Sequence, residues 1–281
     1  MDSSGISFTA LFTGHVWYES GMSARFFTSP KGELLYRGLA PVEYVSKRTF
    51  GFNVHDMLLQ RHLIMDHLIE QHIKNEGVTQ ILEIASGYSP RGYTLSRKFP
   101  QLHYIEADLP HMAKRKTELL AQHKGFGPHH KVVACDVFEE QGPLALQSVL
   151  ANELSPNRPT IIITEGLVNY FKLKHISEFW QKLAELGKAF PKAWYLTDLV
   201  PQPKKGLLPL LMKTATETLS IATRANVNLH FRSTNQIQEA FKGYGFNQVQ
   251  VHHPKSFKDT LNLPIPHNKS IVRVIEAQIH Q

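Results

Sequence analysis

Acidic side chains follow several short apolar runs of this chain, at positions where they could line one pocket. Asp108 ends one such run, Asp136 follows the next, and Glu165 comes directly after the strand predicted at 159–164, which contains the three isoleucines Ile161–Ile163. A carboxylate that follows a buried strand is poorly placed for core packing and well placed to meet a ligand. We therefore expect these three carboxylates to border a binding site.

The first of these carboxylates has a competitor nearby. Asp108 lies 21 positions after Gly87 and ends its predicted strand, where a carboxylate can accept hydrogen bonds from both ribose hydroxyls of a nucleoside. Glu106 lies two residues earlier, and strand alternation places both side chains on the same face. The prediction favours Asp108 and keeps Glu106 as the alternative.

A sharp turn from strand to helix is predicted around Gly87. A residue without a side chain allows the backbone to approach a ligand closely, and Pro90 suits the first turn of the helix that follows. Ala85 stands where the first glycine of the dinucleotide-binding pattern would be. The turn therefore indicates a nucleoside ligand rather than a pyrophosphate.

Two further positions have competing interpretations. Asp136 and Val137 end the third predicted strand, where the carboxylate could reach an adenine amino group, although a turn aspartate explains the position nearly as well. Trp17 and Tyr18 could line a pocket for a second substrate, but aromatic side chains more often serve packing. Asp198 borders the same region or caps a helix.

The elements that must position these residues alternate along the chain. Five strands alternate with helical segments, which predicts a parallel sheet covered on both faces. Two final strands are close enough in sequence to pair antiparallel, and this seven-stranded α/β pattern is typical of class I methyltransferases with a Rossmann-like sheet. The strands are predicted at residues 79–85, 103–108, 131–135, 159–164, 193–197, 246–251 and 270–277.

Residues outside the sheet are assigned to a cap and a lid. We expect residues 1–75 to form an N-terminal cap, aromatic and turn-rich as far as Gly51 and helical from Val54 to Lys74, that contributes to the pocket. Residues 76–281 then form the binding domain. Within it, an insertion at about 202–232 carries an apolar segment, 206–224, that covers the sheet or joins two subunits.

Composition limits the class of protein. The chain has 281 residues, and 31 Lys and Arg against 24 Asp and Glu give a net charge of +7. The basic residues form no long block, so nucleic acid is an unfavoured partner. No apolar run is long enough for a membrane span, and the start resembles no secretory signal, so we expect a cytoplasmic protein. The single Cys135 lies in an apolar run and is expected to pack, and the spacing of the 16 histidines predicts no metal site.

Four motifs make the chain similar to the leucine carboxyl methyltransferase-like family of S-adenosylmethionine-dependent O-methyltransferases, in particular its bacterial polyketide-type branch. The motifs are an arginine in Ser46–Thr49 (SKRT), the turn Glu83–Arg91 (EIASGYSPR), the strand end Glu106–Pro110 (EADLP) before the basic Lys114–Lys116, and Glu165–Leu167 (EGL) with Tyr170. Many relatives have Gly-Ala-Gly and then Asp-Thr-Arg at the turn, where this chain has Ala-Ser-Gly and Ser-Pro-Arg.

The resemblance implies S-adenosylmethionine as cofactor and assigns roles. Glu83, Ala85 and Gly87 would form the cofactor turn, Arg48 would bind the methionyl carboxylate, and Glu165 would bind the methionyl amino group. Asp108 would hold the ribose, Asp136 and Val137 the adenine, and Tyr170 would orient the acceptor.

The expected activity is methyl transfer to a carboxylate or an acidic hydroxyl of a small molecule. An RNA methyltransferase, or a non-catalytic protein that binds S-adenosylmethionine, stays open as an alternative.

Overall fold

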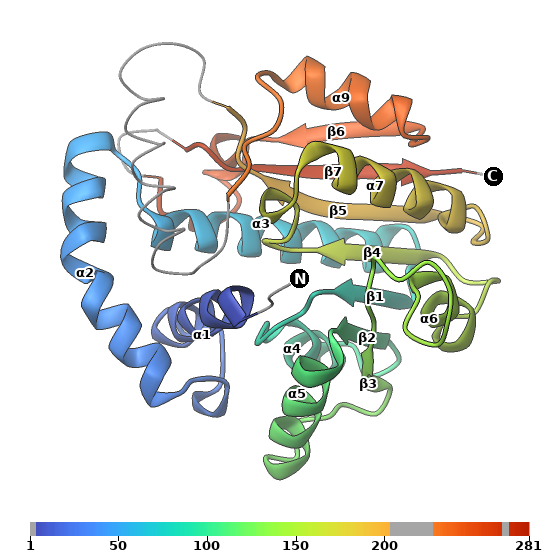
Figure 1. The fold of residues 1–281 in the computed structure, drawn as a ribbon, viewed down its shortest axis with the longest axis horizontal. Helices are drawn as coiled ribbons and strands as arrows, with labels where there is room; N and C mark the ends of the chain where they lie inside the picture. Colours follow the sequence, from blue (N-terminus) through green and yellow to red (C-terminus); the bar gives the residue numbers. More distant parts are fainter. Residues whose placement is uncertain (1–3, 203–226, 266–269, 281) are drawn as a thin grey trace.

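The computed structural model describes residues 4–202, 227–265 and 270–280. Its centre is a seven-stranded sheet with the order β3-β2-β1-β4-β5-β7-β6 (Figure 1). The strands are β1 (Gln80–Ile84), β2 (His103–Asp108), β3 (His130–Ala134), β4 (Thr160–Thr164), β5 (Ala193–Leu199), β6 (Gln248–His252) and β7 (Arg273–Ile279). All seven correspond to predicted strands, so the α/β fold class is confirmed.

The sheet has one parallel part and one antiparallel edge. Strands β1 to β5 run parallel, whereas β7 lies between β5 and β6 and pairs antiparallel with both. The chain proceeds outward from β1 to β2 and β3, and then returns to the other side of β1 with β4. Ligands of such sheets bind outside the carboxyl ends of the strands where the order reverses, which here is the end of β1 and β4.

Helices cover both faces of the sheet. On one face, buried side chains of α6 (Leu146–Glu153), α7 (Leu173–Gly187) and α9 (Thr234–Gly243) form the larger core. On the other face, α3 (Val54–Asn75) and α4 (Arg91–Lys98) form a second core, beside α5 (Pro110–Gln122). Short 3₁₀ turns occupy Arg25–Phe27, Val168–Tyr170 and Pro254–Phe257.

The N-terminal region differs from the prediction. Residues before Gly51 are mostly helical rather than turn-rich, because they form α1 (Ser4–Glu19) and α2 (Pro30–Phe50). Helix α2 has clear end signals: the Ser29 side chain accepts a hydrogen bond from the Gly32 amide, Pro30 occupies the first turn, and Gly51 ends the helix with a φ of 76°. Its interior Pro41 concealed these signals, since proline usually interrupts a helix.

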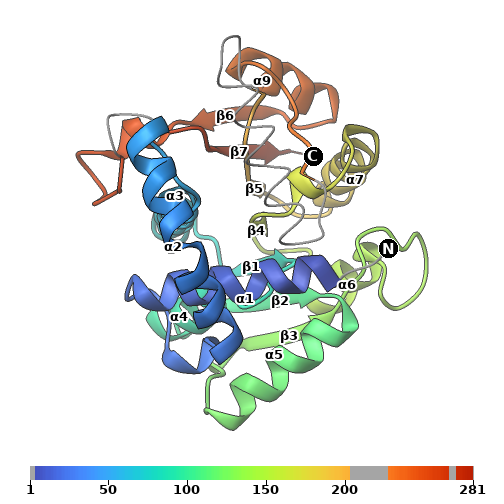
Figure 2. The same cartoon turned by 60° about the vertical axis from the view of Figure 1, so that its left-hand side comes forward.

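The three N-terminal helices have different surroundings. The inner face of α3 packs against the sheet, whereas α1 and α2 lie outside that layer, with α1 near the carboxyl ends of β1 and β2 (Figure 2). Most of the predicted lid, including the apolar segment 206–224, lies outside the described residues. Among the described helices, none is both long and apolar enough to cross a lipid bilayer.

The single cysteine packs as predicted. Cys135 is buried in the larger core, and burial raises the pKa of its thiol to about 12. A thiol that stays protonated at neutral pH is a poor nucleophile. We therefore interpret Cys135 as a packing residue and not as a nucleophile.

Candidate functional site

A cavity lies at the carboxyl ends of β1, β2 and β4, where the strand order reverses. Helix α1 covers it, and Arg61 of α3 forms part of its wall. Its lining includes Ala10, Thr13 and Trp17 of α1, Glu83 of β1, Ala85–Ser89 of the following turn, Asp108, Met112, Glu165, Gly166 and Tyr170. Five of the predicted cofactor residues, together with Tyr170, are thus brought to one cavity.

The turn after β1 has the backbone geometry that the glycine signal predicts. Ala85 and Gly87 both have positive φ angles, 55° and 48°. Such a conformation is unusual for alanine, and it costs free energy that the surrounding structure must supply. A Cβ atom at Gly87 would lie 3.4 Å from the Cβ of Ala10 on the covering helix. The turn therefore approaches α1 closely and leaves backbone amides at the cavity wall.

Asp108 fastens this turn to the end of β2. Its Oδ2 accepts a hydrogen bond of 2.6 Å from the Gly87 amide, and its Oδ1 accepts one of 2.8 Å from Leu109. Burial raises the pKa of the carboxyl, and these amide hydrogen bonds oppose that shift. Because a carboxylate has about four acceptor positions, Asp108 retains acceptor capacity toward the cavity.

Glu106 does not reach the cavity, although its side chain leaves β2 on the same face of the sheet as that of Asp108. It is fully buried, with its carboxylate 2.8 Å from Lys116 Nζ and 3.2 Å from His130 Nε2. Burial raises the pKa of Glu106, but the charges of Lys116 and His130 lower it overall. Glu106 does not line the cavity, whereas Asp108 does.

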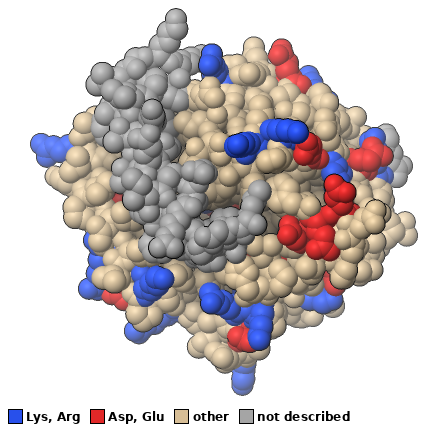
Figure 3. Space-filling view, viewed as in Figure 1, with Lys and Arg blue, Asp and Glu red and all other residues tan. Residues whose placement is uncertain are grey.

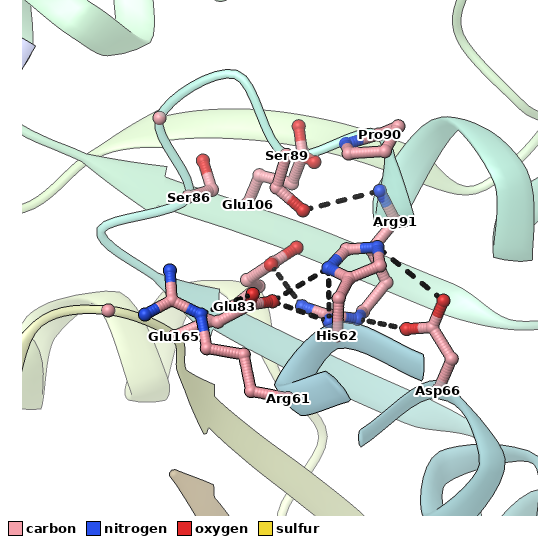
Figure 4. Close-up of polar contacts among 12 residues, drawn as sticks. Arg61, His62, Asp66, Glu83, Ser86, Ser89, Pro90, Arg91, Glu106 and Glu165 are labelled. Carbon is pink, nitrogen blue, oxygen red and sulfur yellow. Dashed lines mark hydrogen bonds and ion pairs between the residues drawn. The ribbon is translucent and has the colours of Figure 1, made fainter. Parts of the chain in front are cut away.

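One polar side chain of the turn lacks a partner. The hydroxyl of Ser86 is buried and makes no hydrogen bond within the described part of the chain. In Figure 4 it points away from the charged residues below the turn. A buried polar atom without a partner is costly, so a ligand that bonds to Ser86 would remove this cost. The turn therefore fits a polar ligand such as a nucleoside amino acid.

A second part of the cavity wall belongs to a cluster of charged side chains, which we call the arginine cluster (Figure 4). Its central residue, Arg91, has no exposed side-chain surface and binds three carboxylates at 2.5 to 2.7 Å. Burial alone would lower the pKa of Arg91, but the neighbouring carboxylates raise it well above its usual value. The cluster comprises Arg61, His62, Asp66, Glu83, Arg91, Glu165 and Asp198.

Glu165 joins the cluster to the cavity. It contacts Arg61 Nε at 3.0 Å, His62 Nδ1 at 2.8 Å and Arg91 Nη2 at 2.7 Å. Burial would raise its pKa, but these three groups hold the pKa of Glu165 well below its usual value. Asp198 does not line the cavity but supports its wall, because its carboxylate accepts hydrogen bonds from Arg61 Nη1 at 3.1 Å and from the Gly166 amide at 2.6 Å.

The arginine cluster has more negative than positive groups. Its four carboxylates face only two guanidinium groups, and the one imidazole, of His62, lies between Glu165 and Arg91. Buried charges are stable only when they are paired or solvated. An excess of carboxylates beside a cavity therefore favours a ligand that carries positive charge.

Three predicted residues lie outside the cavity lining. Arg48 is exposed on α2, where its guanidinium lies 3.4 Å from the hydroxyl of Tyr44. Asp136 accepts a hydrogen bond from the Phe138 amide at 3.0 Å, as a turn aspartate does, and Val137 packs against the larger core. Both follow β3, at the same edge of the sheet as the cavity.

Helix α3 contributes three site residues that the sequence motifs did not indicate. Arg61, His62 and Asp66 interrupt an apolar helix face that includes Ile64 and Met65. Positions 62 and 66 are one turn apart, so the spacing brings them to the same side. Polar and charged residues on an otherwise apolar helix face are the sequence signal that indicates these site residues.

The comparisons with known proteins agree with this geometry. The family model described as leucine carboxyl methyltransferase matches residues 24–184, more than half of the chain. A curated Frankia alni protein, described provisionally as an S-adenosyl-L-methionine-dependent methyltransferase, is 30% identical over 132 residues. That match covers 47% of this chain and 41% of the relative, so the chain matches less than half the length of that protein.

Solved structures share the fold at low sequence identity. A DUF574 family protein from Streptomyces avermitilis has a TM-score of 0.62 at 12% identity, with 96% of this chain and 97% of that chain covered. A Thermobifida fusca protein, described provisionally as a methyltransferase, has a TM-score of 0.58 at 14% identity, with 90% of each chain covered.

Proposed function

This chain belongs to the leucine carboxyl methyltransferase family, and on that premise we propose that it transfers a methyl group from S-adenosylmethionine to an oxygen of a small acidic molecule. The observation that carries the proposal is the contact between the turn after β1 and the end of β2. There, the partly buried Asp108 accepts a hydrogen bond from the Gly87 amide and lines the same cavity as Ser86, whose hydroxyl has no partner among the described residues.

The cavity residues suit the polar groups of this cofactor. Asp108 would accept hydrogen bonds from the ribose, and the Ser86–Gly87 turn would meet the methionyl part. Glu165 would bind the methionyl amino group. For the methionyl carboxylate, Arg61 at the cavity wall is a better candidate than the exposed Arg48. Asp136 and Val137 stay our prediction for the adenine side.

The charge of the wall supports the same cofactor. S-adenosylmethionine supplies an activated methyl group on a sulfonium centre, and it carries a sulfonium and an ammonium against one carboxylate. The arginine cluster has two more carboxylates than guanidinium groups, which complements a ligand with net positive charge. Electrostatic attraction would thus add to the hydrogen bonds of the turn.

The acceptor side requires orientation more than acid–base chemistry. A carboxylate is already a nucleophile at neutral pH, so the protein must align its oxygen with the methyl group and exclude water. Helix α1 covers the cavity with Thr13 and Trp17, while Tyr170 borders it from the segment after β4. We propose that Tyr170 orients the acceptor and that α1 limits access of water.

The surface does not favour the RNA alternative. On the face shown in Figure 3, Lys and Arg side chains lie in separate groups with Asp and Glu side chains among them. Proteins that bind nucleic acid usually gather basic side chains into a patch or stripe. We therefore propose a small-molecule acceptor, in agreement with the enclosed position of the cavity.

The cofactor assignment is tested by calorimetry with S-adenosylhomocysteine. The Asp108→Asn variant should bind it about 10- to 100-fold more weakly, because a charged acceptor of buried ribose hydroxyls is lost. Glu106→Gln is the matched control, since it changes a carboxylate on the same strand face that does not line the cavity. Absence of binding by the folded wild-type protein would contradict the proposal.

Transfer itself is measured with radiolabelled S-adenosylmethionine and a panel of small carboxylic acids and phenols. We expect labelled methyl groups to be transferred to an acid. If the product is a methyl ester, mild base should release the label. Cofactor binding without transfer to any acceptor would instead favour a non-catalytic role.

A further inference from the structure

A second cavity lies on the other side of α1. It has a volume of about 250 Å³, and α1, α2 and the beginning of α3 enclose it. Phe12 faces this cavity, whereas Ala10, Thr13 and Trp17 line the first one. At 100° per residue, Phe12 projects about 100° away from Thr13, about 140° from Trp17 and about 160° from Ala10, so it leaves the helix on another side. Helix α1 is therefore the partition between two separate cavities.

The two carboxylates in this second cavity have different partners. Asp56 is buried and pairs with Lys47, whose Nζ lies 2.9 Å from its Oδ2. Glu43 accepts a hydrogen bond of 2.9 Å from the His55 amide. No cationic side chain of the described residues forms an ion pair with Glu43. The one lysine of the wall thus pairs with Asp56, whereas Glu43 is held by backbone amides at the start of α3, beside His55, and burial raises the pKa of its carboxyl.

Aromatic rings stand beside these carboxylates. The ring of Tyr36 lies 6.3 Å from that of Phe12 and 6.1 Å from that of His55, measured between centroids, and all three residues line the cavity. Burial, followed by the charges of Glu19 and Glu43, raises the pKa of Tyr36, so its hydroxyl stays neutral at physiological pH. The wall thus combines π-systems with a carboxylate that forms no ion pair among the described residues.

This combination has a specific chemical preference. Aromatic faces attract cations through their quadrupole, and quaternary ammonium groups are recognised by such rings together with a nearby carboxylate. A metal ion is disfavoured, because the described residues contain no group of three His, Cys, Asp or Glu side chains that could hold one. We infer that this cavity binds a small organic ammonium ion, with Phe12, Tyr36 and His55 around the alkyl groups and Glu43 beside the charge.

The site is independent of the proposed methyl transfer, but it shares α1 with the first cavity. A ligand held against Phe12 contacts the same helix that presents Thr13 and Trp17 to the first cavity. Binding in one cavity is therefore expected to change affinity in the other by the same factor in both directions.

The test uses choline chloride as the probe and the full chain. Isothermal calorimetry, with sodium chloride at equal ionic strength as the reference, should show saturable binding of one choline per chain. Glu43→Gln should weaken that binding at least tenfold. Glu33→Gln on the same helix is the matched control, because Glu33 is exposed and pairs with Arg37, and it should leave choline binding unchanged.

A second variant separates folding from recognition. Tyr36→Leu retains the charge of Glu43 and removes one ring, so it should also weaken choline binding while the protein still binds S-adenosylhomocysteine. The inference is overturned if choline does not bind, if Glu43→Gln binds it as the wild type does, or if S-adenosylhomocysteine displaces it by simple competition, which would place choline in the first cavity.

Discussion

Helix α3 contributes to two polar clusters, and the two clusters differ in the balance between carboxylates and their basic partners. About two turns after its beginning, Arg61 and His62 belong to the arginine cluster beside the first cavity. Near its end, His72 binds Glu276 of β7, which also binds His252 of β6. The first cluster has an excess of carboxylates, whereas the second gives each oxygen of one carboxylate its own imidazole at 2.7 Å.

The difference separates a ligand site from a structural contact. Each oxygen of Glu276 contacts one imidazole, that of His72 or that of His252, and none of these three residues lines the first cavity. Burial would raise the pKa of Glu276, but the hydrogen bonds from the two imidazoles lower it to about 2. This cluster joins α3 to β6 and β7 away from the first cavity. The arginine cluster borders the first cavity, and its carboxylates outnumber its guanidinium groups.

The largest effect is expected from Arg91→Met. The change leaves three carboxylates without their shared cation in a buried place, so the free energy of unfolding should fall by about 3–5 kcal/mol. Urea denaturation measures it, and the stabilisation by S-adenosylhomocysteine should be lost as well. Arg97→Met on the same helix is the control, because Arg97 bonds mainly to exposed carbonyls and should change stability by less than about 1 kcal/mol. Equal losses of stability in both variants would contradict a special contribution of the buried Arg91 ion pairs.

A smaller effect is expected from Glu276→Gln, which should lower the free energy of unfolding by about 1–3 kcal/mol at neutral pH. The folded-state pKa is lower than the ordinary value near 4.5, so this stabilisation is present above that pH and is lost as the pH falls toward 2. The difference in unfolding free energy between wild type and variant should therefore shrink over that range. The thermal shift caused by S-adenosylhomocysteine should remain. A loss of that shift would mean that the two clusters are coupled.

The smallest effect is expected from His252→Gln. The variant removes one of the two imidazoles that contact Glu276, at a partly exposed position, and the contact with His72 remains. We therefore expect the free energy of unfolding to fall by about 0.5–1.5 kcal/mol. Thermal unfolding at neutral pH measures it. A loss larger than that of Glu276→Gln would show that the two imidazoles do not share the carboxylate as described.

Most of the sheet was predictable from sequence, since its strands are short apolar runs. The three isoleucines before Glu165 form a fully buried β4, and the glycine signal at Gly87 marks the turn. The helices before Gly51 were not predictable in the same way. Helix α1 packs on more than one side and shows no strong apolar stripe, and Pro41 conceals α2.

Sequence by itself determined which residue types stand at the ends of the strands, because strand alternation and turn chemistry are local. It placed Asp108, Glu165 and the turn at Gly87 together, since parallel strands end at one edge of a sheet. Only the tertiary structure shows that Asp108 lines the cavity and Glu106 does not, because Lys116 and His130 from other elements enclose Glu106. It likewise brought α3 and Arg91 to the wall, because burial and charge balance depend on neighbours that are distant in the chain.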